Sequence, residues 1–468
     1  LDAAVAAPFL MHVRDRGRRE TLCRAMATKA AAAPHDNTAR VERILELRRE
    51  QASLLGHPHF AALSLASKMA GTLAAVDALT EQLAAAARAA AARETAEVLA
   101  FARARGFAEP ALQPWDRPFW AERLSEERYR YSDEELRAYF QFPLVLDGLF
   151  ALARRLFDIR IVADDGAAPV WHPDVRLFRV DDPSGESRAW FYLDPYSRPA
   201  TKRSGAWMND LRGRARLPDG TVRRPLALIV CNQTPPAEGR PSLMRFSEVQ
   251  TLFHEFGHTL QHMLTTVDEP GAAGLNNVEW DAVEIASQFM ENWCYDRATL
   301  KGVSRHIDTG EPIPDALFDR IVAAKNFMAA SAMLRQLYLG ATDMDLHARY
   351  PRPGASDADA VKRANAARFL PAPLLPEDRL LCSFSHIFAG GYAAGYYSYK
   401  WSEVLAADAF AAFEEAGLDN DDAVRGTGRR FRETFLALGG SRHPMDVFKA
   451  FRGREPSVGP LLRHAGLA

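Results

Sequence analysis

Cysteine is scarce in this chain of 468 residues: four occur, and no two form a Cys-x-x-Cys pair. So sparse a set excludes a disulfide scaffold and a thiolate metal site, and it is typical of a reducing compartment such as the cytoplasm. We therefore expect four buried apolar thiols, at Cys23, Cys231, Cys294 and Cys382.

Long apolar runs and an excess of one charge are also absent. No run approaches the ~18 residues that a membrane helix needs, and Leu1–Leu10 lacks the basic flank of a signal peptide. The 58 basic and 60 acidic residues give a net charge of −2, which argues against nucleic acid or an anionic membrane as the main partner. The chain starts at Leu1 and not at Met, and we expect that a segment precedes it.

What is present is an ordinary globular composition, 48% hydrophobic and 25% charged. A chain of this length is longer than a single hydrophobic core usually supports, so we expect more than one lobe. We predict three segments: a helical lobe segment at 1–150, an α/β segment with a small sheet at 151–245, and a helical catalytic region at 246–468.

Local patterns place the helices and strands. The alanine-rich stretch Leu79–Arg105 predicts a packed helix. Val175–Val180 and Ala189–Leu193 predict two strands joined by the turn Asp182–Gly185, and the apolar run Leu226–Cys231 predicts a buried strand. The sequence therefore predicts a mostly helical protein with a small β-sheet.

Residues 254–258 read His-Glu-Phe-Gly-His. On a helix, positions four apart share a face, so His254 and His258 can bind one Zn²⁺ together. Glu255 then lies beside the metal, where it can take a proton from a water molecule that the metal has made more acidic. The alternative, for this motif taken alone, is that the two histidines are hydrogen-bonded core or surface residues.

The surrounding residues predict that this segment is a helix. Ser247 and Gln250 form a capping box, and apolar residues recur at spacings of three and four. Gly257 is costly inside a helix, by ~1 kcal/mol relative to Ala. Its presence predicts that another backbone approaches the helix closely there. His262 continues the series but rotates off the metal face, and we interpret it as structural.

A zinc site with two histidines needs a third protein ligand and an open position for water. Glu284, 26 residues after His258, opens a second amphipathic segment and can supply it. The alternative is that Glu284 forms a capping box with Asp281. Asp281 could instead orient a ligand histidine through its second ring nitrogen.

A second cluster lies between Phe384 and Trp401, where His386 and the pair Gly390-Gly391 precede four tyrosines. Glycines followed by phenols suggest a mobile loop whose O–H groups bind an oxyanion. The alternative is a tyrosine-rich packing segment. Spacing alone slightly favours the packing segment.

Taken together, these residues resemble the thimet oligopeptidase family of zinc metallopeptidases, and within it the bacterial oligopeptidase A branch. The blocks that carry the resemblance span nearly the whole chain in the family's order. They are Trp171–Val175, Gly205–Met208, Phe253–His258, Trp280–Trp293, Phe384–Trp401 and Phe451–Pro456.

The resemblance implies one Zn²⁺ held by His254, His258 and Glu284, with Glu255 as general base. It also implies that Tyr399, Tyr392 and His386 contact the scissile carbonyl or the peptide backbone. The implied fold is a two-lobed helical zincin-type peptidase with a small β-sheet and a deep substrate channel. The implied substrates are short peptides such as signal-peptide fragments, cut by a cytoplasmic enzyme that we expect to be a monomer without nucleic-acid or membrane partners.

The sequence departs from the family pattern at Ala286, where Pro is usual, and at Ser204, where Gly is usual, and the family's chains extend further at the N-terminus. The pair Gly390-Gly391 favours an endopeptidase over the dipeptidyl carboxypeptidases of the same family, which usually have Asn at the first of these positions. Two alternatives stay open: a dipeptidyl carboxypeptidase, and a truncated non-catalytic remnant that binds peptides.

Overall fold

The fold was analysed in a computed structural model, which describes residues 3–130, 132–203, 205–237, 239–351, 354 and 356–468; Ser204 therefore lies outside the described residues. The chain forms two compact units. Unit 1 comprises Leu1–Arg130, Ala323–Trp401 and Leu462–Ala468, and unit 2 comprises Tyr131–Val322 and Ser402–Leu461. Each unit is thus built from segments distant in the sequence.

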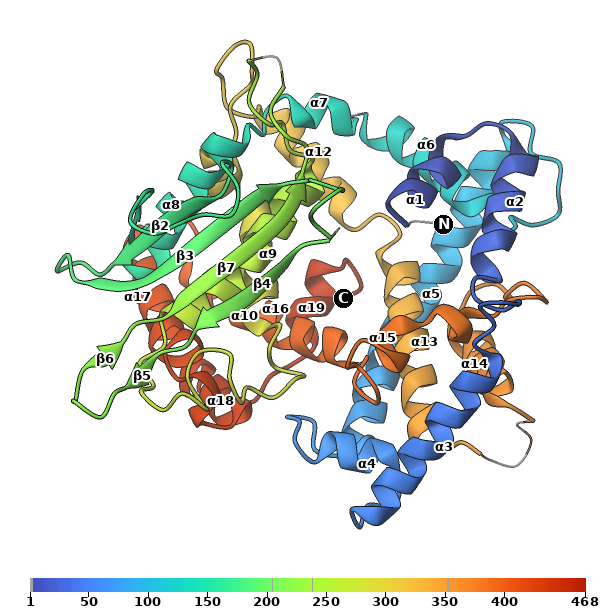
Figure 1. Ribbon diagram of the computed structural model, residues 1–468. Helices are drawn as coiled ribbons and strands as arrows, with labels where there is room; N and C mark the ends of the chain where they lie inside the picture. The colour runs from blue at the N-terminus through green and yellow to red at the C-terminus, as the bar shows by residue number, and fades with distance from the viewer. Residues whose placement is uncertain (1–2, 131, 204, 238, 352–353, 355) are drawn as a thin grey trace. The chain divides into compact units, whose positions relative to one another are not determined.

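Unit 1 is helical. Its longest helix, α5 (Leu73–Arg103), packs along α13 (Ala329–Ala348) (Figure 1). Alanines such as Ala84, Ala87 and Ala91 are fully buried on α5, because small side chains let two helices approach closely. The other helices are α1 (Ala3–His12), α2 (Arg16–Ala27), α3 (Thr38–Leu54), α4 (Phe60–Leu65), α6 (Arg117–Tyr129), α14 (Ala358–Phe369), η2 (Leu380–Ser383) and α15 (Ser385–Phe388).

Unit 2 contains a five-stranded sheet of order β1-β2-β3-β7-β4, in which β3 and β7 run parallel and the other neighbours antiparallel. A separate two-stranded ribbon pairs β5 with β6. The strands are β1 (Arg160–Ala163), β2 (Arg176–Asp181), β3 (Ser187–Tyr196), β4 (Trp207–Arg212), β5 (Ala215–Arg216), β6 (Val222–Arg223) and β7 (Leu226–Gln233).

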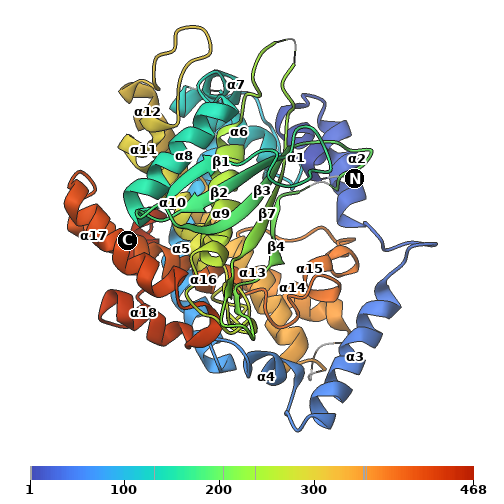
Figure 2. The same ribbon diagram turned by 60° about the vertical axis from the view of Figure 1, so that its left-hand side comes forward.

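Helices α8 (Phe142–Phe157) and α9 (Phe246–Met263) cover one face of this sheet (Figures 1 and 2). Phe150 of α8 contacts Phe178 and Phe191, which stack on neighbouring strands with ring centroids 5.2 Å apart, and it also contacts Phe256 of α9. The sheet thus fixes one side of the helix that carries the His-Glu-x-x-His motif.

The other helices of unit 2 surround an aromatic cluster. Phe289 of α10 (Ile285–Asn292) stacks on Phe431 of α17 (Asp421–Phe431) with ring centroids 4.1 Å apart, and Trp293 packs edge-on to Phe410 and Phe413. The elements not yet given, some of which continue into unit 1, are α7 (Asp133–Arg137), η1 (Trp293–Tyr295), α11 (Arg297–Gly302), α12 (Asp315–Lys325), α16 (Ser398–Ala416), the π-helix η3 (Arg432–Leu436), η4 (Gly439–Ser441), α18 (Pro444–Arg452) and α19 (Gly459–His464).

The prediction of a mostly helical protein with a small sheet is confirmed. The three predicted strands correspond to β2, β3 and β7, whereas β1 and β4 were not predicted. All four cysteines are free; three are buried as expected, but Cys23 is only half-buried. Within the described part of the chain, no helix is long and apolar enough to cross a membrane.

Candidate metal centre

The two histidines of the predicted motif lie one turn apart on α9, in unit 2. Their Nε2 atoms lie 3.3 Å (His254) and 3.1 Å (His258) from the same carboxylate oxygen, Oε2 of Glu284. The three side chains predicted as zinc ligands therefore converge on one point.

Glu284 reaches this point because α10 begins directly after it and packs against α9. The carboxylate makes no helix-capping hydrogen bond and accepts one from Ser287 Oγ at 3.0 Å, so the capping-box alternative is not found. Gly257 makes the helix contact possible: a Cβ built there would lie 2.4 Å from the carbonyl oxygen of Ala286. The predicted close approach of another backbone is confirmed.

The residues fit a divalent metal ion. Two imidazole nitrogens and one carboxylate oxygen lie within 4.8 Å of one another, which is the donor set of a metal site that keeps one position open. Within the described ranges, the other group of this kind joins His12, Glu122 and Glu126 in unit 1. Two of its three members are exposed, and exposed acidic groups often gather without an ion.

Glu291 contacts one of the predicted ligands, and we did not predict this contact. Its Oε1 lies 2.6 Å from Nδ1 of His254, so the ring can donate this N–H while Nε2 faces the other ligands. Glu291 follows Glu284 by seven residues, two helical turns on the same face, which is the signal that could have identified it. Neither ligand histidine hydrogen-bonds the Asp281 side chain, the orienting residue that we proposed, and Nδ1 of His258 has no hydrogen-bond partner among the described residues.

The charged groups of this cluster shift one another's pKa values. Burial opposes protonation of His254, but hydrogen bonds to Glu284 and Glu291 outweigh it and raise the pKa of His254 to about 10. Burial likewise opposes ionisation of Glu284, but the hydrogen bonds from His254 and His258 hold the pKa of this carboxyl far below its usual value. The cluster thus favours an anionic carboxylate facing imidazoles.

Glu255 is buried, with 7% of its surface exposed, and its carboxylate makes no hydrogen bond within the described part of the chain. Burial raises its pKa, while the charges of His254 and His258 lower it and those of Glu284 and Glu291 raise it. A poorly solvated carboxylate in the field of the ligand residues has the properties of a general base.

Helix α9 starts at Phe246, with Arg245 at the N-cap, so the predicted capping box of Ser247 and Gln250 is wrong. The reciprocal bond is made two residues earlier, where the Glu248 carboxylate accepts the N–H of Arg245 at 2.7 Å. His262 is buried, and its Nε2 lies 3.1 Å from the carbonyl oxygen of Arg212, which agrees with a structural role.

The tyrosine loop belongs to unit 1. The rings of Tyr392 and Tyr399 stack with centroids 4.8 Å apart, and the N–H of Tyr392 donates to the carbonyl of His386 at 3.0 Å. Tyr396 and Tyr397 are buried packing residues, whereas Tyr392 and Tyr399 are half-buried. The loop therefore combines both interpretations: two tyrosines pack, and the two predicted to act keep surface open to solvent.

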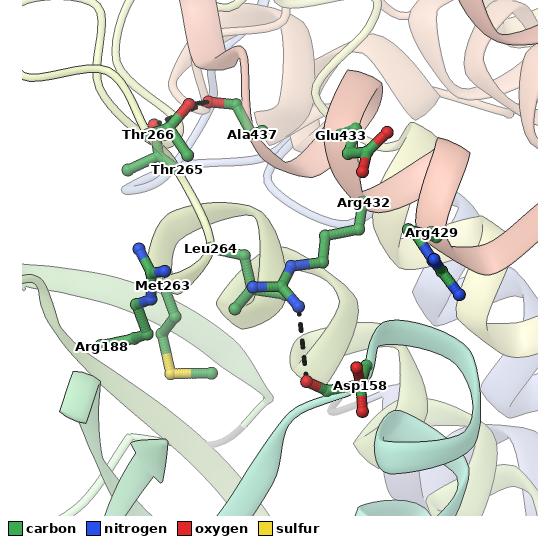
Figure 3. A pocket seen from close by; sticks show the side chains of 10 residues that line it. All are labelled: Asp158, Arg188, Met263, Leu264, Thr265, Thr266, Arg429, Arg432, Glu433 and Ala437. Atoms are coloured by element: carbon green, nitrogen blue, oxygen red, sulfur yellow. Dashed lines mark hydrogen bonds between the residues drawn. The ribbon is translucent and has the colours of Figure 1, made fainter. Parts of the chain in front are cut away.

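A cavity of about 380 Å³ borders the C-terminal end of α9 (Figure 3). Charges of both signs line it, including Arg188, Arg432, Asp158 and Glu433, and no predicted site residue does. Arg432 donates to the carbonyl oxygens of Phe157, at 2.6 Å, and Asp158. Its guanidinium thus satisfies carbonyl groups at the end of α8, which is a structural role.

A family model described as peptidase family M3 matches residues 9–467. The chain belongs to this family. The probable cytosolic oligopeptidase A of Arabidopsis thaliana is 52% identical over all of this chain and 67% of that protein. Oligopeptidase A of Escherichia coli K12 is 44% identical over all of this chain and 68% of the length of that protein. The chain is thus a metallo-oligopeptidase of this family that spans about two thirds of the length of these relatives.

Among solved structures, the match to PZ peptidase A with an inhibitor covers 98% of this chain and 69% of the PZ peptidase A chain. The TM-score is 0.55 and the sequence identity is 14%. At so low an identity the match shows the fold alone. It is the fold that the resemblance implied, a helical metallopeptidase with a small sheet.

Proposed function

We propose that this chain holds one zinc ion with His254, His258 and Glu284 and cuts short peptides at internal bonds, with Glu255 as general base. The observation that carries the proposal is the approach of both imidazole Nε2 atoms to one carboxylate oxygen of Glu284, at 3.3 and 3.1 Å. Two imidazole nitrogens and one carboxylate oxygen are the protein ligands of catalytic zinc sites that keep a fourth position for water.

Zinc, when bound, would supply Lewis acidity toward a carbonyl oxygen and a water molecule. Glu255 would take a proton from the attacking water and return it to the nitrogen of the leaving amine. Its burial and raised pKa support this role, because a carboxylate that is poorly solvated is a stronger base. Glu291 would hold the ring of His254 in the orientation that presents Nε2.

The hydroxyls of Tyr399 and Tyr392 would donate to the oxyanion of the tetrahedral intermediate, and His386 would contact the peptide backbone. The family resemblance supports these roles, as does the partial exposure of both phenols. The loop belongs to unit 1 and the metal cluster to unit 2, and steady-state kinetics of tyrosine variants test these roles.

The decisive experiment compares zinc content and cleavage of a quenched fluorescent peptide in the wild type and in Glu255→Gln. We expect the variant to keep one zinc and to lose about 10²–10⁴-fold in turnover. Glu269→Gln, at an exposed position beyond α9, is the control that should change neither. Stoichiometric zinc with no cleavage by the wild type would contradict the proposal and favour the peptide-binding remnant. Mass spectrometry of the products separates internal cleavage from removal of C-terminal dipeptides.

We also propose a cytoplasmic location, which the four free cysteines and a relative named as cytosolic support. That the protein is a monomer with no nucleic-acid or membrane partner stays a prediction. Light scattering coupled to size-exclusion chromatography tests the oligomeric state.

A further inference from the structure

A fully buried carboxylate holds the backbone of the tyrosine loop. Asp343 lies on α13, in unit 1, and accepts hydrogen bonds from three successive backbone N–H groups. Its Oδ1 binds Ala394 at 2.9 Å, and its Oδ2 binds Gly395 at 2.8 Å and Tyr396 at 2.9 Å. Bonds from N–H groups to an ionised carboxylate are among the stronger hydrogen bonds in proteins, and burial protects these from competition by water.

Asp343 is itself held by an oriented series of side chains. Nδ1 of His347, one turn further along α13, lies 2.9 Å from both Oδ1 and the carbonyl oxygen of Asp343. The other ring nitrogen, Nε2, lies 2.9 Å from Nη1 of Arg48. Because a guanidinium only donates, Nε2 must accept, which places the imidazole proton on Nδ1, directed at Asp343. The buried negative charge is thus supported from α3 through a neutral histidine.

The same stretch of loop is bound from its carbonyl side as well. The Ser64 hydroxyl, on α4, lies 3.1 Å from the carbonyl oxygen of Ala393 and 3.0 Å from that of Ala394. Between these contacts Ala394 adopts a φ of +45°, which is strained for a residue with a Cβ. Such a conformation persists only where neighbouring contacts fix it. The hydrogen bonds that Asp343 accepts from the backbone N–H groups are one set of these contacts.

We propose that Asp343 is a positioning residue for peptide hydrolysis. By fixing residues 394–396, the carboxylate determines where the phenols of Tyr392 and Tyr399 lie on either side of the fixed segment, with their rings stacked at 4.8 Å. The preceding glycines, Gly390 and Gly391, are exposed and make no such contact with Asp343. Residues 394–396 are therefore the fixed part of the loop, and Gly390 and Gly391 lie outside it. This inference rests on the proposed roles of the two tyrosines.

The test uses Asp343→Asn in the full, zinc-loaded chain. One carboxylate oxygen becomes an NH₂ group that meets backbone donors, so at least one of the three hydrogen bonds is lost. We expect faster hydrogen exchange at the amides of residues 394–396, unchanged zinc content, and a fall in kcat of about 10–10²-fold with a smaller change in KM, because misplacing a catalytic group by ~1 Å costs about this much.

Asp116→Asn is the matched control. Asp116 is also fully buried in unit 1, and it pairs with Arg16 and Arg19 and not with the loop. We expect this variant to lose comparable thermal stability while its kcat and its loop exchange stay those of the wild type. Equal losses of kcat in both variants would show a general effect of stability and overturn the inference.

Two variants of His347 decide the matter if Asp343→Asn does not fold. His347→Asn keeps an N–H donor toward Asp343, and His347→Leu does not. A kcat that falls in His347→Leu but not in His347→Asn supports the inference, and equal kcat values in these two variants overturn it. If Asp343→Asn shows faster hydrogen exchange in the loop but unchanged kinetics, the inference is also overturned, while Glu255→Gln still tests the proposed function. If Glu255→Gln is fully active, the proposed function fails first.

Discussion

The α-carbon of Gly257 faces the carbonyl oxygen of Ala286 so closely that a Cβ would lie 2.4 Å from it. This contact joins the helix that carries two ligands to the helix that begins after the third. The position of Glu284 therefore depends on Gly257 having a hydrogen atom in place of a side chain.

Gly257→Ala should consequently damage the metal site without touching a ligand. The added methyl group must push α10 and α9 apart, which we expect to cost about 1–3 kcal/mol of stability and to weaken zinc binding. Urea unfolding and competition with a fluorescent chelator measure the two effects. Gly426→Ala is the control, since Gly426 lies within α17 with open space around its α-carbon and should gain about 0.5–1 kcal/mol. Wild-type zinc affinity in Gly257→Ala would contradict the argument.

Glu291→Gln should weaken zinc binding by about 10–100-fold, the usual effect of removing a group that orients a ligand histidine. The amide can still approach Nδ1 of His254, but it no longer offers a charged acceptor. Titration against a chelator gives the affinity, and Glu433→Gln, at an exposed position of unit 2, serves for comparison. Equal affinities in the two variants would mean that the 2.6 Å contact does not orient the ring.

Zinc binding should release a proton at neutral pH. In the metal-free chain the pKa of His254 is raised to about 10, so its imidazole is protonated at pH 7 and must lose that proton to bind a metal. The pKa of Glu284 is lowered, so this carboxyl is already ionised and contributes no proton. The apparent affinity should therefore rise about tenfold per pH unit as the pH increases from 7 toward the pKa of His254. Calorimetry at pH 7 in two buffers of different ionisation enthalpy counts the protons, and a count of zero contradicts the prediction.

Tyr399→Phe should lower kcat by about 10²–10³-fold with little change in KM, as expected for a donor that binds the oxyanion and not the substrate's ground state. Tyr397→Phe is the comparison, because the Tyr397 ring packs in a core cluster with Leu65 and Val76. Steady-state kinetics on one fluorescent peptide are sufficient. Similar kcat values for the two variants would leave the tyrosine-rich segment as packing only.

The strongly patterned parts of the site could be predicted from the sequence. The spacing of His254 and His258 fixes a shared helix face, and the cost of a glycine inside that helix pointed correctly to a neighbouring backbone. Glu284 could be proposed as a third ligand because it opens an amphipathic segment. These features are local, and local patterns are what periodicity reports.

Features that depend on tertiary contacts were missed. Strand β4 is an edge strand with four exposed residues in succession, so it has no apolar alternation. Asp343 stands in an ordinary polar stretch of sequence, and only the fold shows that its carboxylate is buried against loop amides. The start of α9 was misplaced because Ser247 resembles a cap, whereas the chain uses Glu248 to bind the N–H of Arg245.

The stack of Phe289 on Phe431 has a consequence for how the metal site arises during folding. Phe289 belongs to the helix that Glu284 precedes, and its stacking partner Phe431 lies 142 positions later in the sequence. A polypeptide ending before α17 would retain all three proposed ligands in its sequence and still lack Phe431, the ring that stacks on Phe289 of that helix. Metal binding is therefore expected late, after distant parts of unit 2 have come together, and nascent chains should bind zinc poorly until α17 has been synthesised.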